Sequence, residues 1–357
     1  MNLHLSLKFK VLSFVLIIFV IFLHSYNLTE HSPEALVKVT GINFLQEVIS
    51  FGITRVAVPI FFFISGYFFF TNFKLKTGVI KEKLLKRIST LLIPYVLWSI
   101  LIFIFYFLLQ SLPPMVKYFN RELVTNLSID EIFRRILLDP IPYQLWFVRD
   151  LMLLVIISPL IYSLIKYGKV LFLSILIIAW MQLFSLVVVS NEALLFFCVG
   201  GYFQLNNTPL EKNNSAKYGV LITLLWIFSL IIRVHLMNNG QLNLLENTYF
   251  YKINILLGIV AIWLLYDGLI GEKESTKLRK LKPLNYSFSL YLLHEPILTI
   301  FKKIFFKVFG ASDNSSIMIF FLAPILTIAV SLLIADRVSR FFPRVYKVLT
   351  GNRIINS

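Results

Sequence analysis

The sequence predicts an all-α polytopic membrane protein, and three observations support this fold class. Hydrophobic residues make up 58% of the 357 residues and charged residues only 15%, whereas soluble globular proteins average about 45–50% apolar and about 25% charged residues. The mean hydropathy is +0.81. Apolar runs of roughly 20 residues, the length that spans a bilayer as a helix, recur along the chain. This composition excludes a soluble enzyme, a disordered regulator and a fibrous repeat.

About ten of these runs are long enough to cross the membrane, and each must be helical because hydrocarbon cannot satisfy an open strand edge. We expect the spans at 9–27, 48–73, 88–112, 141–165, 169–189, 191–206, 218–238, 249–270, 284–308 and 316–340. The first contains an apolar run at 11–23 that is similar to a signal-peptide core. No A-x-A-like cleavage site follows it, so we expect a retained first helix.

Positive charges are distributed unevenly between the loops, which predicts the orientation of these helices. With a cytoplasmic N-terminus, 22 of the 34 Lys and Arg residues lie in inside segments and 8 in outside segments, as the positive-inside rule requires. We therefore expect both termini in the cytoplasm and one domain over residues 1–357, with a helical core at about 9–340 and a short basic cytoplasmic tail at 341–357. The basic loops at 74–87 and 273–282 either contact anionic lipid or attract a phosphate-rich substrate such as coenzyme A.

Three of the spans carry ionisable groups at similar depth in the outer half of the membrane and a fourth carries a pair just below, which predicts a shared polar cavity. His24 follows Lys10 by 14 positions, which places it roughly 21 Å along the first helix at 1.5 Å per residue. Arg55 and Arg149 enter from the outer side in the second and fourth spans, and His294-Glu295 lies near the midplane of the ninth. Ionisable groups at such depths are costly and mark either functional sites or buried pairs.

Each of these groups has a functional and a structural interpretation. His24 is either a general base that removes a proton from a hydroxyl near neutral pH or a helix-end histidine at the headgroup level. Arg55 and Arg149 either bind a substrate or pair with acceptors inside the bundle. Asp150 follows Arg149 directly, but adjacent helical residues point about 100° apart, so we do not expect these two charges simply to neutralise each other.

Proline and glycine predict bends in two of the spans. Pro296 kinks the ninth span and frees a backbone carbonyl, so His294-Glu295 either repairs this kink or binds a substrate. Pro59 and Gly66 predict a bend in the second span and a close approach of another backbone at Gly66. Ser65 lacks a G-x-S-x-G context, and it is more typical of a helix hydroxyl that bonds a carbonyl than of a nucleophile.

Several common motifs are missing from the sequence. It has no Walker A motif, no dinucleotide glycine fingerprint, no H-E-x-x-H and no Cys/His ligand spacing, and Cys198 is the single cysteine. The sequence thus supports neither a disulfide framework nor metal, ATP or NAD chemistry.

The chain resembles the acyltransferase 3 family, whose integral membrane members modify sugars of bacterial envelope polysaccharides and lipopolysaccharide. The resemblance covers about residues 10–340 and lies in blocks that are specific only together. These blocks are 22–25 (FLHS), 58–67 (VPIFFFISGY), 87–98 (ending LLIPYVLW), 145–151 (LWFVRDL) with 158–161 (SPLI), and 287–296 (SFSLYLLHEP).

This resemblance implies an O-acyltransferase with a ten-helix core in the bacterial cytoplasmic (inner) membrane. It implies acyl-CoA, usually acetyl-CoA, as a cytoplasmic donor and a sugar hydroxyl of a glycan or lipid-linked saccharide as acceptor, with no metal. His24 matches the first-helix histidine that the family uses for transfer, and Arg149 matches a recurrent position. We expect catalytic roles for His24 and Arg149. The candidate substrate-binding residues are Arg55, Ser65, Trp146, His294 and Glu295.

One departure from the family pattern concerns the donor. Many members have an acidic residue 14 positions and an arginine 11 positions before the histidine, where this chain has Lys10 and Ser13. Either Arg55, Arg149 or Lys10 replaces that arginine, or the donor is bound differently.

Two other functions stay open beside acyl transfer. One is a non-enzymatic polysaccharide exporter or flippase, and the other is a structural membrane subunit, which the clustered buried charges disfavour. His24-dependent transfer of label from a thioester to a glycan distinguishes acyl transfer from both of these functions, because only acyl transfer requires it. Membrane lipid is a further expected partner. Nucleic acid is not, because the net charge of +16 is explained by the loops that orient the helices.

Overall fold

The computed structural model describes residues 3–27, 41–119, 122–182, 188–210 and 215–353, and in these ranges it contains helices and turns but no strand. The predicted all-α class is confirmed. Among the described residues, seven helices are long and apolar enough to cross a membrane. They are Leu3–Ser25, Phe44–Phe70, Thr77–Gln110, Ser158–Met181, Lys217–Asn238, Leu244–Leu269 and Asp313–Phe341. The chain is thus a multi-pass membrane protein, while the count of ten spans and their orientation stay predictions. Part of the expected span 169–189, and Lys38, Arg121 and Lys212 of the charge count, lie outside the described residues.

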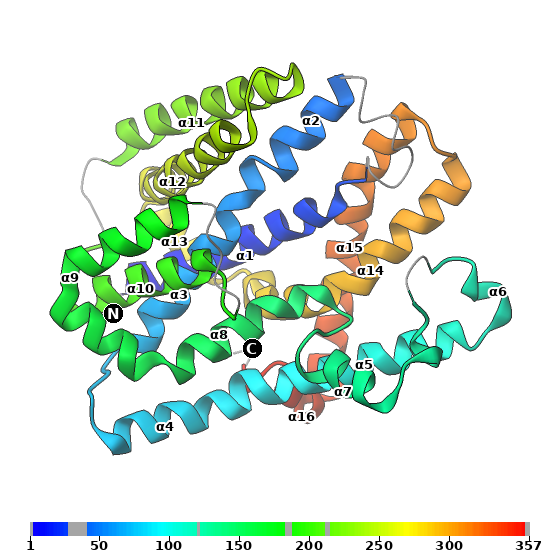
Figure 1. Cartoon of the computed structure of the whole chain (residues 1–357), viewed down its shortest axis with the longest axis horizontal. Helices are drawn as coiled ribbons and strands as arrows, with labels where there is room; N and C mark the ends of the chain where they lie inside the picture. Colours follow the sequence, from blue (N-terminus) through cyan, green and yellow to red (C-terminus); the bar gives the residue numbers. More distant parts are fainter. Residues whose placement is uncertain (1–2, 28–40, 120–121, 183–187, 211–214, 354–357) are drawn as a thin grey trace.

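Helix α1 (Leu3–Ser25) lies in the middle of the molecule (Figure 1). It contacts α3 (Ala57–Phe70), α14 (Ser287–Phe309) and α15 (Asp313–Phe341). Its side chains at Leu16 and Ile17 are fully buried. A helix that is apolar on all sides must be covered on all sides by protein or lipid, and here neighbouring helices bury half of it.

The second expected span is broken into α2 (Gly41–Ser50), a 3₁₀ turn η3 (Ile53–Val56) and α3. Pro59 lacks the N–H that would bond to the carbonyl of Arg55, and its ring crowds that carbonyl. The predicted bend is therefore confirmed, and it falls one turn before the proline. The break leaves Arg55 at the joint between two helical pieces.

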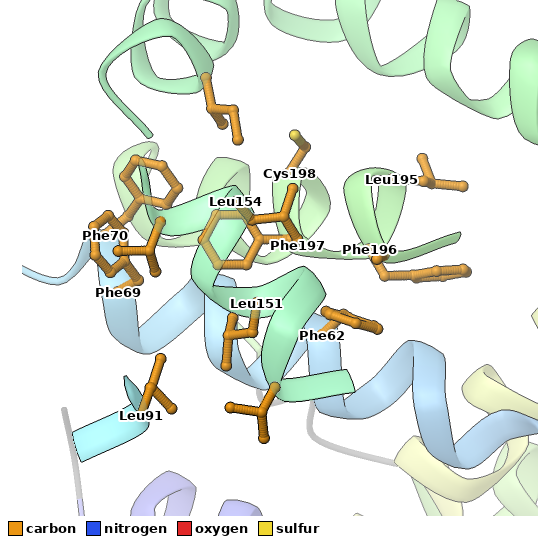
Figure 2. Packing of buried hydrophobic residues seen from close by; sticks show 14 of the residues in the cluster. Phe62, Phe69, Phe70, Leu91, Leu151, Leu154, Leu195, Phe196, Phe197 and Cys198 are labelled. Atoms are coloured by element: carbon orange, nitrogen blue, oxygen red, sulfur yellow. The ribbon is translucent and has the colours of Figure 1, made fainter. Parts of the chain in front are cut away.

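Helix α3 packs closely against α10 (Asn191–Leu205) through small residues. A Cβ atom at Gly66 would lie 2.1 Å from the carbonyl oxygen of Phe197, and one at Gly200 would lie 2.0 Å from that of Phe63. The predicted backbone approach at Gly66 is confirmed. Figure 2 shows the aromatic cluster on this contact, where Phe62, Phe69 and Phe70 meet Phe197 and the leucines of α8 (Trp146–Ile156).

The fourth expected span, 141–165, is not one continuous helix. Helix α8 ends at Ile156, and α9 (Ser158–Met181) begins directly after Ile157. Pro159 at the start of α9 explains the break, because proline disfavours helical continuation through the residues before it. A second irregularity lies at Lys169, where φ is 44°.

The remaining long helices form two pairs and one extended rod. Helices α11 (Ser215–Asn238) and α12 (Leu244–Leu269) pair along one edge of the molecule (Figure 1), and α14 pairs with α15. Helix α4 (Thr77–Arg87) continues through a π-helical turn (Ile88–Leu92) into α5 (Ile93–Gln110). Shorter helical elements connect them. They are α6 (Pro113–Val116), η5 (Val124–Asn126), α7 (Ile129–Leu137), η6 (Tyr143–Leu145), α13 (Glu272–Arg279) and η7 (Lys282–Tyr286).

The described part of the expected tail, 341–353, is folded onto the bundle. Helix α16 (Pro343–Leu349) follows α15, and the indole of Trp98 donates a hydrogen bond to the carbonyl of Leu349 at 3.1 Å. The hydroxyls of Ser289 and Tyr346 lie 2.7 Å apart. These contacts bring Arg353 to the start of α14, where its guanidinium lies 3.5 Å from the Phe288 ring.

Candidate active site

A cavity of about 900 Å³ extends along α1, and Lys10, Ser13 and His24 line it. Lys10 and His24 are 14 residues apart, which corresponds to roughly 21 Å along a helix. The cavity therefore reaches from one end of the central helix to near the other. We refer to its two ends as the Lys10 end and the His24 end. Of the ionisable groups that were expected to share a cavity, His24 and Arg55 line this one, whereas Arg149, His294 and Glu295 are not among its lining residues.

At the His24 end, aromatic rings enclose the imidazole. The His294 ring lies parallel to it at 5.6 Å with an angle of 12°, and the Tyr143 ring meets it edge-on at 4.9 Å. Among the described residues, no side chain or backbone group hydrogen-bonds a ring nitrogen of His24. The ammonium of Lys302 donates to the carbonyls of His24 and Tyr26 at 3.4 and 3.1 Å, which holds the end of α1. The two rings and the Lys302 contacts thus hold His24 in place at the wall of the cavity.

Arg55 lines the same end of the cavity. Its guanidinium lies over the rings of Phe51 and Tyr251 at 5.1 and 5.9 Å. Its Nε is buried and has no hydrogen-bond partner among the described residues. Glu192 lies within electrostatic range of Arg55 and also lines the cavity. A guanidinium with an unused N–H donor at the wall of a partly apolar cavity suits an oxyanion that develops during a reaction.

Three basic residues besides Arg55 and His24 line the cavity. They are Lys10, Arg87 of α4 and Arg353 of the segment after α16, and the two guanidinium groups of Arg87 and Arg353 lie within electrostatic range of each other. Desolvation is the larger cause, and repulsion from Arg87 the smaller one, of a pKa of Arg353 that is lowered to about 10. An anion between these two guanidinium groups would relieve that repulsion. Guanidinium and ammonium groups grouped in this way are typical of phosphate sites.

Much of the cavity wall is apolar and aromatic. Phe61, Phe147 and Tyr291 line it, together with Ser65 and Trp146, two of the predicted substrate-binding residues. Apolar walls with a few placed polar groups are usual for small-molecule sites. The structure thus brings His24, Arg55, Ser65 and Trp146 to one cavity.

Arg149 is not among the residues that line this cavity. Its Nη2 lies 3.1 Å from Oδ1 of Asp150, and its Nη1 donates to the carbonyl of Leu138 at 3.0 Å. The expectation that Asp150 would not neutralise Arg149 is wrong. Although the two Cα–Cβ bonds diverge, the long arginine side chain folds back to reach the neighbouring carboxylate. Asp150 also accepts a hydrogen bond from the backbone of Ser190, so the pair joins α7, α8 and the start of α10.

His294 and Glu295 lie behind the cavity wall at the kink of α14. His294 is fully buried, and its Nδ1 donates to the carbonyl of Tyr291 at 2.8 Å. Backbone torsions at Glu295 are non-helical, and the amide of Gln144 donates to its carbonyl at 3.4 Å. These bonds satisfy backbone carbonyls near the kink, which agrees with the interpretation that His294-Glu295 repairs the kink at Pro296. The carboxylate of Glu295 accepts from Tyr143 and Thr299 at 3.1 and 2.7 Å.

Three further residues of the cavity wall were not singled out from the sequence as site residues. From the sequence, Arg87 and Arg353 were considered only as basic residues of the loops and the tail. No local sequence feature marks Arg353 as a site residue, because the fold brings it to the cavity from the end of the chain. Glu192 could have been found from the sequence. It is an acidic residue within the expected span 191–206, and ionisable groups in spans mark functional sites or buried pairs. Among the described residues, no group of three His, Cys, Asp or Glu side chains is placed to hold a metal ion.

Comparison with known proteins adds two findings to this geometry. The family model described as acyltransferase domain matches residues 9–336. The succinoglycan biosynthesis protein ExoH of Rhizobium meliloti (strain 1021) is 25% identical over 361 residues, which cover 99% of this chain and 94% of that protein. No solved structure matches the chain.

Proposed function

The chain belongs to the acyltransferase-domain family, and from this premise we propose that it transfers an acetyl group from acetyl-CoA to a hydroxyl of a cell-envelope or exported polysaccharide. The similarity to a protein named for succinoglycan biosynthesis supports a polysaccharide as the acceptor. We place the protein in the bacterial cytoplasmic membrane as one domain of ten helices, with the Lys10 end facing the cytoplasm.

The observation that carries this proposal is the cavity that connects three basic residues to His24. Acyl-CoA is an elongated molecule with phosphates at one end and a thioester at the other. Lys10, Arg87 and Arg353 would bind the phosphates, and the apolar middle of the cavity would hold the pantetheine arm. The thioester would then lie near His24 and Arg55. In this arrangement Arg87 and Arg353 supply the positive charge that relatives place at the position of Ser13.

His24 would act as the general base. It takes the proton from the acceptor hydroxyl, and the oxygen attacks the thioester carbonyl carbon. Arg55 donates hydrogen bonds to the carbonyl oxygen as it becomes negative. The carbon–sulfur bond then breaks, the ester forms, and the proton passes from the imidazolium to the departing CoA thiolate. His294, Tyr143 and Lys302 are positioning residues, because they hold the imidazole ring and the end of α1.

The experiment that tests this function compares the O-acetyl content of envelope polysaccharide by NMR in cells with the gene, without it, and with His24→Ala. We expect the acetyl signals to disappear in the last two strains while the polysaccharide is still made. General-base catalysis contributes typically 10²–10⁴-fold, so the loss should be nearly complete. Acetylated polysaccharide that fails to reach the surface in the deletion strain would instead indicate an exporter and refute the proposal.

A further inference from the structure

The segment after α15 folds back onto the bundle and reaches the cavity that contains His24. It consists of α16 and residues 350–353, and we call it the C-terminal strap. The strap lies beyond residue 336, where the match to the family model ends, so membership of the family gives it no role. Helix α16 contacts α5, which lies beside it (Figure 1). Arg353, at the end of the strap, lines the cavity.

Contacts with the rod of α4 and α5 fix the path of the strap. The indole of Trp98 donates a hydrogen bond to the carbonyl of Leu349. The chain then turns at Gly351, where φ is +67°, and a Cβ atom at this position would lie 2.4 Å from the carbonyl oxygen of Thr90. Both the positive φ and the close approach require glycine. These contacts fix the backbone just before Arg353.

Two contacts hold the Arg353 side chain. Its guanidinium lies 3.5 Å from the centre of the Phe288 ring, and its Nη1 donates to the carbonyl of Thr350 at 2.6 Å. A guanidinium has five N–H donors at its edge, and stacking on a ring uses only its face. Arg353 is also exposed. It therefore retains donors that a ligand in the cavity can reach.

Arg87 supplies a second guanidinium near Arg353. It lies 5.5 Å from the centre of the Phe69 ring, which also lines the cavity, and it is within electrostatic range of Arg353. In the part of the chain that the structure describes, neither guanidinium pairs with a carboxylate. Two like charges repel each other, so this pair favours an anion in the cavity.

The chemistry of the pair distinguishes between the phosphates of CoA, which has a diphosphate bridge and a 3′-phosphate on its ribose. Each phosphorus of the bridge carries a single negative charge and has two terminal oxygens. The 3′-phosphate is a monoester, which carries about −1.5 to −2 charge near pH 7 and has three terminal oxygens. Two planar guanidinium groups can bind such a group together through parallel hydrogen bonds. The monoester therefore matches Arg87 and Arg353 better than the bridge does.

We propose that the C-terminal strap makes the enzyme select its donor by the 3′-phosphate of CoA, which Arg353 and Arg87 bind together. The strap carries Arg353 to the cavity, and the contact at Gly351 positions it. This inference rests on the proposed function, because acetyl-CoA is the donor of that reaction, and it assigns one phosphate of the donor to one pair of residues. A lipid headgroup or free phosphate shares this chemistry, so the test distinguishes these sources.

Binding of CoA and of 3′-dephospho-CoA to the full-length protein in phosphatidylcholine nanodiscs tests the assignment. Calorimetric titration gives both Kd values, and their ratio measures recognition of the 3′-phosphate. A hydrogen bond to a charged group contributes about tenfold or more. We expect the wild type to bind CoA about 100-fold more tightly than 3′-dephospho-CoA, and Arg353→Gln about tenfold more tightly. Arg344→Gln is the matched control and should keep the wild-type ratio, because Arg344 is exposed on α16 and does not line the cavity.

Gly351→Ala tests the strap separately from its charge. The added methyl group must move the strap away from Thr90, so the Kd ratio should fall toward that of Arg353→Gln although Arg353 is retained. Gly310→Ala controls for backbone strain, since Gly310 has a φ of +74° and nothing lies within 4 Å of an added Cβ. A wild-type ratio in Gly351→Ala would overturn the role of the strap.

Other results would overturn the assignment of the phosphate. These are equal Kd values for the two ligands in the wild type, or an equal loss of affinity for both in Arg353→Gln. Phosphatidic acid as a tenth of the lipid, or inorganic phosphate at about 1 mM, should leave the ratio unchanged. A fall to the Arg353→Gln ratio would instead identify a lipid or free phosphate as the occupant.

Transfer from radiolabelled donors in membranes separates this inference from the proposed function. The wild type should use acetyl-CoA far better than acetyl-3′-dephospho-CoA. Equal use of the two donors would refute this inference and leave the function intact. A wild-type Kd ratio of about 100-fold without transfer of acetyl groups to saccharide would refute the proposed function alone.

Discussion

At the scale of single residues, His24 depends on partners that lie far from it in sequence. His294 stacks on its ring, Tyr143 contacts the ring edge, and Lys302 holds the carbonyl at the end of α1. Depth along a helix predicted that His24 would face a cavity. Its neighbours could not be predicted in the same way, because depth does not determine the direction in which a side chain points. Arg149 shows this limit, since it lies at a similar depth and yet pairs with Asp150 outside the cavity lining.

The role of Arg149 can be tested by Arg149→Lys. Its bonds to Leu138 and Asp150 favour a structural role, and an ammonium cannot reproduce both of them with the planar geometry of a guanidinium. We therefore expect membrane abundance and acetyl transfer to fall together. Immunoblotting and radiolabel transfer on the same membranes measure the two quantities. Normal abundance with lost transfer would restore the catalytic interpretation.

Arg353→Gln tests the donor end of the cavity. A hydrogen bond between charged groups contributes about 1.5–3 kcal/mol, and 1.4 kcal/mol corresponds to a factor of ten. We expect the KM for acetyl-CoA to rise about tenfold or more while kcat changes little, because this residue lies far from the thioester. Arg344→Gln is the control, since Arg344 is exposed on α16 and is not among the lining residues. Equal KM values for the two variants would contradict the proposed role of Arg353 in binding the donor.

At the scale of helices, the irregular points of the fold are the points that carry the site. Arg55 lies in the 3₁₀ turn before α3, Glu295 lies at the kink of α14, and Tyr143 begins the short turn before α8. Proline stands close to each of them, at Pro59, Pro296 and Pro142. Pro59 and Pro296 were interpreted correctly from the sequence. The break after Ile156 was missed, because hydrophobic run length cannot distinguish one kinked helix from two, although Pro159 was a local signal.

The tight contact of α3 and α10 predicts the effect of Gly66→Ala. The added methyl group would overlap the backbone carbonyl of Phe197, so the helices must separate, and overpacking of this kind costs about 1–3 kcal/mol. We expect reduced thermal stability and membrane abundance, measured by fluorescence-detected gel filtration of a tagged protein. Gly78→Ala is the matched control. Gly78 is also helical, with nothing within 4 Å of its added Cβ, and alanine favours helix there. Equal stability of the two variants would contradict the described packing.

At the scale of the whole molecule, segments that were expected on one side of the membrane contact one another. Lys8 near the N-terminus pairs with Asp267 at the end of α12, at 2.7 Å. At the other end, Lys302 bonds the carbonyl of Tyr26, and Lys303 bonds that of Tyr118. This relative arrangement agrees with the loop assignment that the charges predict. The side of the membrane on which each end lies is still set by the charge bias alone.

Reporter fusions test that orientation. Fusions after Arg87 and after Lys282 should report the cytoplasm, and a fusion near Asn126 should report the outer side, because Lys and Arg are retained on the cytoplasmic side. Alkaline phosphatase and green fluorescent protein give opposite signals on the two sides and control for expression. Phosphatase activity of the fusion after Arg87 would contradict the predicted orientation.

The central claim is that a donor entering at the Lys10 end is used at His24 near the opposite end of the bundle. Sealed membrane vesicles of both orientations, given radiolabelled acetyl-CoA outside, test it most directly, because CoA does not cross the bilayer. Inside-out vesicles should incorporate label into saccharide, right-side-out vesicles should not, and His24→Gln should lower incorporation by at least about 100-fold, since glutamine hydrogen-bonds but cannot take the proton. Incorporation by right-side-out vesicles alone, or by inside-out vesicles with His24→Gln at the wild-type rate, would contradict it.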